Sequence, residues 1–499
     1  MQPVLELLTP DLVDRILDEA FRLLQQPGVK VQLPEGQQLL QAAGATVDAG
    51  REVVRIPEAT LRRALETVPH EFSLYTREGE PTVHYGGNTV QFDPGSSGVH
   101  VLDPETGQHR PSVTPDLVRL IQVAEMLPAY DAQSTAVVCN DVPQAIGDLY
   151  RLFLVLLYSK KPIVTGAFST ATLPPMVDML AIFRGGREGL VQKPLAVFDV
   201  CPTPPLIWSR FAAQNLIDLA RAGVPAQMVS MPLAGVGAPV TLLGSVVQHA
   251  AESLSGIVLH QLARPGAPIV WGGAPAIFDM RRGTTPMGAV ETAMIDVAYA
   301  QVGKSLGLPT HTYLGASDAK LIDAQAGMES GISAVLGALG GINMISGAGM
   351  LDFLACQSAE KLVVDAEAIG MARRLLGGMQ VRTTTLALEM FAGIDFKPDF
   401  LKQKLTRQLF GAEQYLPSSV IDRGSARAWQ DAGRPDTMVR ARARTQEILK
   451  GYKRPRASDE QEAELRDLVT GLARQAGMDA LPPLSDESQA RGPSSPRVV

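Results

Sequence analysis

Short apolar runs of strand length alternate with helix-length amphipathic segments through the middle of the chain. Seven runs are rich in aliphatic and β-branched residues, and nearly all of them end in small or polar residues before a helical stretch. These runs cover 134–139, 162–166, 195–199, 226–230, 268–271, 310–314 and 342–345. An eighth run near 362–365 is less sharply bounded. Repeated strand, loop and helix units indicate a parallel sheet that is buried on both faces.

The number of these units favours a closed barrel. About eight units in about 280 residues are typical of a (β/α)8 barrel, so we predict an α/β fold with a TIM barrel over 112–395. A doubly wound open sheet is the alternative. The flanking patterns predict an N-terminal α+β region over 1–111 and a C-terminal helical region over 396–478. A disordered tail is expected over 479–499, which becomes rich in Ser, Pro and Arg.

Composition and charge exclude several classes of protein. The chain has 499 residues, of which 45% are hydrophobic and 19% charged, and this balance excludes wholesale disorder. A net charge of −7 gives no basic field for nucleic acid. The three cysteines stand far apart without a CxxC pair, so we expect a reducing cytoplasm and no disulfide framework. The first residues lack a signal-peptide pattern, and the apolar stretch 333–356 contains five glycines, so we predict no membrane span.

Candidate metal and phosphate sites have weak support. Cys139, Cys201 and His311 fall near predicted strand ends, but nothing has the close ligand spacing of a zinc motif. We therefore predict no metal, and no flavin or nicotinamide, because no GxGxxG follows the first strand. Gly347 and Gly349 directly follow an apolar strand. They could cradle a phosphate, although glycines there more often form a tight turn between strand and helix.

The stretch 313–329 is the most informative single segment. It runs from an apolar strand through a glycine-containing loop into a helix. We predict catalytic roles for Asp318 and Lys320 and substrate contacts for Asp323 and Gln325, because loops after barrel strands carry active sites. The alternative, held equal, is structural: Asp318 or its neighbour caps the helix, and Lys320 pairs with Asp323 three residues later.

Scarce aromatic residues gather near the predicted barrel mouth. Aromatic residues make up only 5% of the chain, yet Phe168, Trp271 and Tyr313 lie in or just after predicted strands, and Asp199 closes the third strand. Aromatic faces and a carboxylate suit a quaternary ammonium, which has no hydrogen to donate, and each good cation–π contact contributes about 0.5–2 kcal/mol. Ordinary core packing is the alternative for each aromatic residue taken singly.

Over about 10–455 the chain resembles the trimethylamine methyltransferase family of corrinoid-dependent enzymes. The order and spacing of several short motifs carry the resemblance. The motifs are Gly-Val-Lys-Val at 28–31, Gly-Ala-Thr-Val-Asp at 44–48, Arg-Ile-Pro at 55–57, Asp103 through Gly107 with His109 and Arg110, Ser-Asp-Ala-Lys-Leu-Ile-Asp-Ala-Gln at 317–325, Gly-Ala-Gly-Met-Leu at 347–351, Glu-Lys-Leu-Val-Val-Asp-Ala-Glu at 360–367, Leu-Pro at 416–417 and Ile-Asp-Arg at 421–423.

The resemblance implies a TIM barrel that moves a methyl group from a methylated amine to the cobalt of a partner corrinoid protein. The chain would then need no tightly bound cofactor of its own. The founding trimethylamine enzymes carry pyrrolysine inside the barrel, whereas this sequence has only standard residues. Relatives without pyrrolysine are associated with quaternary amines such as glycine betaine, carnitine or proline betaine. We therefore expect a small methylated amine as substrate, a corrinoid protein as partner and a homo-oligomeric enzyme.

Residue roles follow from this resemblance and from position at predicted strand ends. We assign electrostatic support of the ammonium to Asp318 or Asp199, and contact with its methyl groups to the aromatic residues. We expect a substrate carboxylate to be bound by Lys320, His311 or Arg281. The loop that contains Gly347 and Gly349 is expected to face the corrinoid.

Two other functions stay open. A barrel enzyme of the lyase or decarboxylase type would use Asp318, Lys320 and Asp323 as acid and base groups on a small carboxylate. A non-catalytic protein that binds betaine-like ligands is the third hypothesis.

The segment 397–456 is locally basic, with 14 Lys and Arg against 6 Asp and Glu, and the rest of the chain carries a net charge of −15. An acidic partner would be attracted to such a segment. We therefore predict that it is a docking surface for the corrinoid protein. A solvated helical face, or burial in a homo-oligomer, is the alternative.

Overall fold

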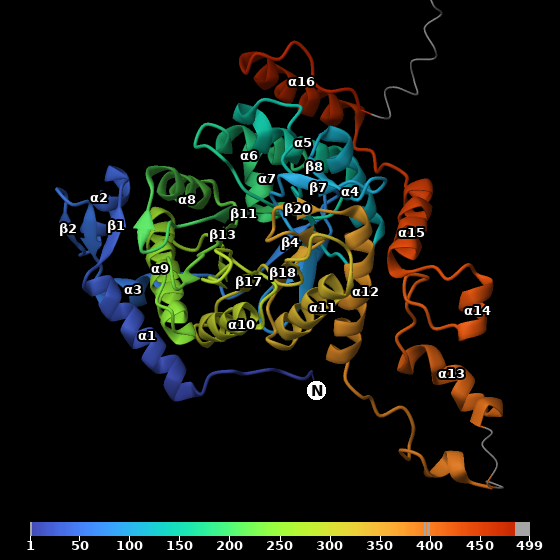
Figure 1. Ribbon diagram of the computed structural model, residues 1–499. Helices are drawn as coiled ribbons and strands as arrows, with labels where there is room; N and C mark the ends of the chain where they lie inside the picture. Colours follow the sequence, from blue (N-terminus) through green and yellow to red (C-terminus); the bar gives the residue numbers. More distant parts are fainter. Residues whose placement is uncertain (1, 394–395, 397–399, 485–499) are drawn as a thin grey trace, which may run out of the picture.

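The computed structural model describes residues 2–393, 396 and 400–484. Its centre is an eight-stranded parallel sheet rolled into a barrel (Figure 1). The strands are β6 (Gln91–Pro94), β9 (Gln133–Ser134), β10 (Ile163–Thr165), β11 (Ala196–Val200), β13 (Ala226–Met228), β15 (Ile269–Gly273), β17 (Thr310–Thr312) and β18 (Met344–Ala348).

The barrel is nearly closed. Hydrogen bonds join its strands in the order β6-β18-β17-β15-β13-β11-β10-β9. The two outermost strands also meet, because the Asp131 N–H just before β9 donates to the Phe92 carbonyl of β6 at 2.8 Å. The strands follow one another around the barrel in chain order, without the reversal that defines an open doubly wound sheet. The predicted TIM barrel is confirmed, and the open-sheet alternative is wrong.

A layer of helices surrounds the barrel and connects successive strands (Figure 1). A helix that joins two parallel strands begins near the carboxyl end of the first and ends near the amino end of the second. Helix starts therefore mark the barrel mouth, and helix ends mark the opposite face. The helices are α4 (Thr114–Met126), α5 (Gly147–Tyr158), α6 (Leu173–Ile182), α7 (Arg187–Gln192), α8 (Arg210–Ala222), α9 (Leu242–Ala263), α10 (Val290–Ser305), α11 (Ala324–Leu339) and α12 (Ala359–Leu376), with a 3₁₀ turn, η1 (Gln144–Ile146), before α5.

Helix α9 is the one described helix that is long and apolar enough to cross a membrane. However, 83% of its most apolar window is buried inside the fold. It packs against α1 (Pro10–Gln25), α3 (Glu58–Leu65), α8 and α10. We therefore interpret its apolar surface as core packing.

Side chains along each barrel strand alternate between the interior and the helical layer. Val197 and Val270 belong to the interior cluster, while the following residues, Phe198 and Trp271, pack in the outer cluster with the helices. The hairpin of β4 (Phe72–Tyr75) and β5 (Pro81–Tyr85) adds further side chains to the interior cluster. This hairpin closes the amino-terminal end of the barrel, so the carboxyl end is left as the open mouth.

The predicted strand near 362–365 is wrong, because these residues lie inside α12. The Ser358 side chain caps that helix by accepting from the Lys361 N–H, which commits the apolar run to a helix. The missing barrel strand is β6, which lies before residue 112 and ends in Asp93-Pro94. It was not counted among the barrel strands because it precedes the regular alternation of strands and helices and ends in turn-like residues. How the chain divides into domains stays a prediction, but the barrel sheet includes a strand from the 1–111 region.

Short elements before and after the barrel strands form small sheets around it. A sheet at the N-terminal side contains β2 (Thr46–Asp48), β3 (Val53–Arg55), β1 (Val29–Val31) and β12 (Ile207–Trp208), next to α2 (Pro34–Ala42). The loops after β6 and β18 form a second sheet near the mouth. Its strands are β19 (Met350–Leu351), β20 (Cys356–Gln357), β7 (His100–Leu102) and β8 (His109–Pro111), and a further pair joins β14 (Leu233–Ala234) to β16 (Ala276–Ile277).

The C-terminal extension runs along the outside of the barrel (Figure 1). Its elements are η2 (Leu388–Phe391), η3 (Phe400–Lys402), α13 (Lys404–Glu413), α14 (Ala426–Asp431), α15 (Thr437–Gly451) and α16 (Asp459–Gln475). Helix α15 packs against α12 and α4, and α16 packs against α5 and α6. Most of the predicted tail, from residue 485 onward, lies outside the described residues.

Candidate active site

A cavity of about 370 Å³ opens at the mouth of the barrel. It lies where the carboxyl ends of β10, β11, β13, β15 and β17 meet the loops after β6 and β18, which is where barrel enzymes hold their substrates. Its lining is mainly apolar and contains one carboxylate. The lining residues are Ser96, Ser97, Gly166, Ala167, Phe168, Asp199, Val200, Cys201, Phe211, Asn215, Val229, Met231, Ala274, Tyr313 and Leu354.

Asp199 is the carboxylate of this cavity. The Tyr313 hydroxyl donates to its Oδ2 at 2.8 Å, and the Gln227 amide donates to its Oδ1 at 2.7 Å. The Tyr85 hydroxyl, from the hairpin that closes the barrel floor, donates to Gln227 at 3.1 Å and fixes the amide. Burial raises the pKa of Asp199 to about 6, while the two hydrogen bonds and the Arg151 charge oppose that rise. Asp199 is therefore mostly ionised at neutral pH and is held in one orientation.

Aromatic side chains face the same space. Phe168, Phe211 and Tyr313 line it, and 43% of Phe168 is exposed. The Phe168 N–H donates to the Asp148 carboxylate at 2.6 Å, and its ring lies 4.4 Å from the buried Arg151 guanidinium. The ring is therefore fixed from behind and exposed toward the cavity. These aromatic walls and one carboxylate form a compartment suited to a cation without N–H groups.

Arg151 is a part of this arrangement that the sequence reasoning missed. It is fully buried, and its Nη1 donates to Ser97 Oγ at 3.1 Å and to the Thr135 carbonyl at 2.8 Å. Burial lowers its pKa to about 10, so it keeps its charge at neutral pH. The signal was available: Arg151 lies within the otherwise apolar run of α5, where a charged residue requires buried partners.

A chain of buried polar groups lies in the barrel interior. The Ser346 hydroxyl donates to Asp93 Oδ1, and His311 Nε2 lies 3.0 Å from Ser346 Oγ. The Ser346 hydroxyl therefore links Asp93 to His311. Burial holds the pKa of Asp93 well above its usual range and lowers that of His311 to about 3. His311 is uncharged and buried, so it does not fit the predicted role of binding a substrate carboxylate.

The structure brings together Asp199, Tyr313 and Phe168 of the predicted site residues, and it places the others elsewhere. Trp271 points outward and donates to the Tyr299 carbonyl of α10 at 2.9 Å. Arg281 is 88% exposed along its side chain and pairs with Asp279 at 2.9 Å. Neither side chain reaches the cavity, since one is enclosed by helices and the other extends into solvent.

The 318–325 stretch holds neighbouring loops together. Asp318 accepts hydrogen bonds from the Met287 and Gly288 N–H groups at 2.8 and 2.9 Å, and burial raises its pKa to about 6. Asp323 caps α11, and Gln325 donates to Glu329 at 2.9 Å. Lys320 pairs with Asp352 at 3.1 Å instead of with Asp323. None of these four side chains lines the mouth cavity. The catalytic roles predicted for Asp318 and Lys320, and the substrate contacts predicted for Asp323 and Gln325, stay predictions.

Gly347 and Gly349 are required by close packing at the end of β18. A Cβ at Gly347 would lie 2.3 Å from the Leu314 carbonyl, and Gly349 adopts a φ of +82°. The Gly349 N–H donates to the buried Asp365 carboxylate at 2.7 Å. That N–H is therefore committed and does not form part of a phosphate cradle.

Metal ligands do not converge within the described ranges 2–393, 396 and 400–484: no group of three or more His, Cys, Asp or Glu residues there could hold an ion. The cysteines are free, and Cys139 and Cys356 are buried. Burial raises the pKa of both thiols to about 12, so they are protonated at neutral pH.

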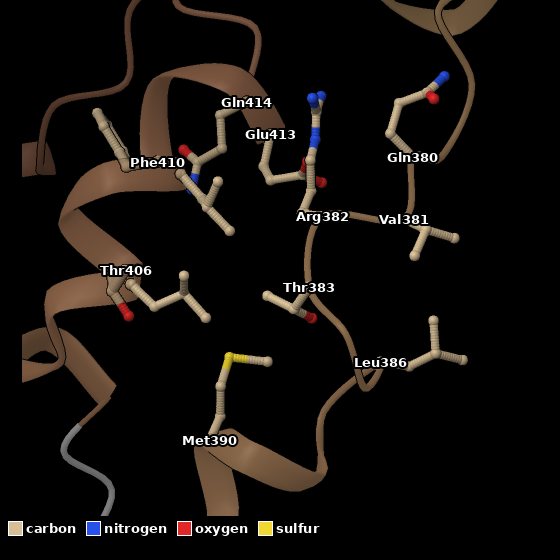
Figure 2. Close-up of a pocket in the computed structure, with 12 residues that line it drawn as sticks. Gln380, Val381, Arg382, Thr383, Leu386, Met390, Thr406, Phe410, Glu413 and Gln414 are labelled. Carbon is tan, nitrogen blue, oxygen red and sulfur yellow. The ribbon is translucent and has the colours of Figure 1, made fainter.

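A second hollow, of about 340 Å³, lies in the C-terminal extension between residues 380–390 and α13. Figure 2 shows Thr383 and Met390 directed into the space of this hollow, with Arg382 beside Glu413 at one edge. That pair, 2.7 Å apart, is at the surface. The hollow is formed by residues outside the barrel and contains none of the predicted site residues, so we place the active site in the mouth cavity.

Comparisons with known proteins agree with this architecture. The family described as Trimethylamine methyltransferase (MTTB) matches residues 1–478. Trimethylamine methyltransferase MttB of Methanosarcina thermophila is 33% identical over 462 residues, covering 90% of this chain and 93% of that protein. Glycine betaine methyltransferase of Desulfitobacterium hafniense (strain Y51) is 28% identical over 477 residues, covering 95% and 98%.

Among solved structures, the monomethylamine methyltransferase of Methanosarcina barkeri matches with a TM-score of 0.53 and 12% identity, over 89% of this chain and 88% of that one. At that identity the match shows the fold alone. Family membership rests on the sequence match over 1–478. The chain therefore belongs to the trimethylamine methyltransferase family, and it is a methyltransferase.

Proposed function

We propose that this methyltransferase moves a methyl group from a quaternary amine, of the glycine betaine kind, to Co(I) of a corrinoid held by a partner protein. The observation that carries the proposal is the mouth cavity, where Asp199 and the aromatic walls of Phe168, Phe211 and Tyr313 surround one space. A trimethylammonium group presents only methyl groups, so it is recognised by aromatic faces and a nearby negative charge rather than by hydrogen bonds. The name of the glycine betaine relative supports the same class of substrate.

The chemistry requires little more of the chain than binding, orientation and exclusion of water. In the reaction the methyl C–N bond breaks, its electron pair stays on nitrogen, and the new Co–C bond takes both electrons from Co(I). A quaternary nitrogen leaves as a neutral tertiary amine, so no proton has to be supplied. Asp199 and the aromatic walls would hold the ammonium so that one methyl points to the open mouth, in line with the incoming acceptor. The apolar lining would keep water from the reacting carbon.

The acid–base alternative gains no support from this geometry. Among the described residues lining the cavity, Asp199 is the one titratable carboxylate, and Lys320 and Asp323 do not line it. Binding without catalysis stays testable in the same experiment. We infer a cytoplasmic location from the free cysteines, and association of the chain with copies of itself stays a prediction.

The corrinoid partner must approach the mouth, because the amino-terminal end of the barrel is closed. The described part of the basic segment, 400–456, does not lie at the mouth along its whole length. Tyr452, just after α15, donates to the Tyr158 carbonyl at 2.5 Å, and Tyr158 is the last residue of α5, at the face opposite the mouth. Arg440 is committed to the Val420 and Pro435 carbonyls at 2.8 and 2.6 Å. We therefore propose that the mouth loops provide the main docking surface, with the basic segment adding attraction from the flank.

The proposal is tested by incubating the purified protein with Co(I) cobalamin and a panel of N-methylated compounds, and following methylcobalamin by absorbance. Transfer from glycine betaine, carnitine or proline betaine, with less from trimethylamine, is the expected result. Binding of a betaine without transfer to cobalamin or to the corrinoid protein would favour the hypothesis of a non-catalytic protein that binds betaine-like ligands. Release of CO2 from small carboxylates, without methyl transfer, would establish the acid–base alternative.

A further inference from the structure

We infer that Lys320 is a positioning residue: it holds the turn Asp352-Phe353-Leu354 in place, and this turn sets the cavity wall formed by Leu354. The inference rests on the proposed function in one respect, namely that the mouth cavity is the amine site. It assigns to Lys320 a role through the protein, without contact between its ammonium group and the substrate.

The turn has an unusual backbone. Asp352, Phe353 and Leu354 have φ angles of 51°, 57° and 68°, so three consecutive residues with side chains adopt the left-handed region. L-residues other than glycine visit this region mostly as single residues, because Cβ approaches the following carbonyl. Such a run persists only where surrounding contacts determine it, and it is found most often beside functional sites.

Lys320 contacts two of the three residues in the turn. Its Nζ lies 3.1 Å from Asp352 Oδ1 and 3.8 Å from the centre of the Phe353 ring. The same Nζ donates to the Asp318 carbonyl at 2.6 Å, which fixes the ammonium group over the turn. The Asp352 N–H also donates to the Ala319 carbonyl at 3.0 Å. The loop after β17 therefore binds this turn through both backbone and side chain.

A histidine supports the lysine from the other side. His109 Nε2 lies 2.8 Å from the Lys320 carbonyl, and its Nδ1 lies 3.7 Å from Asp352 Oδ2. The residue after the turn, Ala355, is also held in place. Its carbonyl accepts from the N–H groups of Val99 and His100 at 2.9 and 3.0 Å. The contacts thus hold the middle of the turn mainly through Lys320 and its end through the strand β7.

Leu354 is the member of the turn that reaches the site. It lines the mouth cavity and packs with Tyr313 against the small apolar cluster that includes Ala274. Tyr313 is also the donor to Asp199, so movement of Leu354 would change the wall beside the carboxylate. Release of the turn should therefore weaken binding of a small ammonium and permit a bulkier one, with less effect on the chemical step.

Lys320→Ala and Lys320→Met remove the ion pair and the cation–π contact, and Lys320→Arg preserves both. The matched control is Lys30→Ala, which removes the ion pair between Lys30 and Glu52, 3.5 Å long and similarly exposed. This pair belongs to the N-terminal sheet and does not line the mouth cavity. Hydrogen–deuterium exchange of the 352–355 amides is measured without substrate. Exposed ion pairs and cation–π contacts are modest, so exchange should be faster by about threefold to tenfold in the Ala and Met variants. It should stay at the wild-type rate in the Arg and control variants.

Kinetics with glycine betaine and Co(I) cobalamin provide the second readout. The KM should rise by about threefold to tenfold in the Ala and Met variants, with kcat within about twofold of wild type. Leu354→Ala should reproduce the rise in KM and the gain for bulkier amines. Unchanged exchange, faster exchange with unchanged KM, or a loss of kcat alone would each overturn the inference. If wild type transfers methyl from no amine, the proposed function fails, whereas the exchange result still decides whether Lys320 holds the turn.

Discussion

Asp199→Asn is the most direct test of the site, because it removes a charge with almost no change in shape. Asparagine can still accept from Tyr313 through its amide oxygen, at the site where that hydroxyl now donates at 2.8 Å. The barrel floor beneath it, with Gln227 held by Tyr85, is left unchanged apart from an amide rotation. A loss of activity would therefore report on the negative charge rather than on collapse of the cavity.

The size of the expected loss in activity follows from the attraction between the Asp199 carboxylate and the substrate ammonium in a partly buried site. At about 5 Å, a separation that leaves room for the methyl groups, and at an effective dielectric constant of about 20, two unit charges attract by about 3 kcal/mol. Part of this is retained by the amide dipole, so we expect a loss of about 2–3 kcal/mol. In kcat/KM this is a decrease of about 30-fold to 150-fold at pH 8.

The pH dependence makes the test specific. Burial raises the pKa of Asp199 to about 6, so the carboxylate is ionised above that pH and becomes neutral below it. A quaternary nitrogen keeps its charge at every pH. In the wild type, kcat/KM for glycine betaine should therefore fall as pH drops through about 6, and by pH 5 it should be about tenfold below its plateau. In the Asn variant this acid limb should be absent.

Methyl transfer from glycine betaine to Co(I) cobalamin, followed by absorbance from pH 5 to 8.5, measures both effects. The circular dichroism of the variant provides the control for folding. An Asn variant with wild-type kcat/KM at pH 8 would refute the role of Asp199 as counter-charge. An acid limb that survives the substitution would show that another group is responsible for it.

Three further outcomes are expected. Phe168→Ala removes an aromatic wall whose ring is 43% exposed, so KM for the quaternary amine should rise by about 3-fold to 30-fold, while Phe168→Tyr should stay close to wild type. Tyr313→Phe removes the hydroxyl that stabilises ionised Asp199, and the acid limb of kcat/KM should move up by about one pH unit. Lys361→Ala leaves Asp365 buried without its partner at 2.7 Å, and urea unfolding should show a loss of about 3–5 kcal/mol. Arg187→Ala, which breaks an exposed pair, should cost less than about 1 kcal/mol.

The barrel could be predicted because its strands are buried on both faces and therefore appear as continuous apolar runs. The same rule failed at 362–365, where three apolar residues follow a buried lysine inside a helix. There the Lys361–Asp365 pair, four residues apart, was the helical signal. Strand β6 was not counted as a barrel strand because it precedes the regular alternation of strands and helices and ends in Asp93 and Pro94, which are typical of turns.

The site residues show which part of the geometry a sequence can give. Asp199 and Tyr313 were found because they end strands, and strand ends meet at the mouth. His311 lies two residues before Tyr313 and shares its inward face, but it is about 7 Å deeper in the barrel, where it bonds to Ser346. Trp271 pairs with Thr310, the residue before His311, and lies on the alternate face of the sheet, so it packs among the helices. A shift of one residue along a strand decides whether a side chain points into the barrel or toward the helices. The apolar runs in the sequence did not define the strand positions to within one residue.

The distribution of charge in the barrel explains why one carboxylate suffices for the proposed reaction. Beneath the cavity, burial raises the pKa of Asp93 and lowers that of His311, and both shifts disfavour a charge there. Asp199 is different: its pKa of about 6 stands above the usual 3.8, so the fold loses stability as pH rises through that interval, by about 3 kcal/mol in all. An unfavourable buried charge of this size is explained if a cation completes the site. A quaternary ammonium does so without bringing a proton, and after losing its methyl it leaves as a neutral amine that the carboxylate no longer attracts. The group that binds the substrate thereby also favours release of the product.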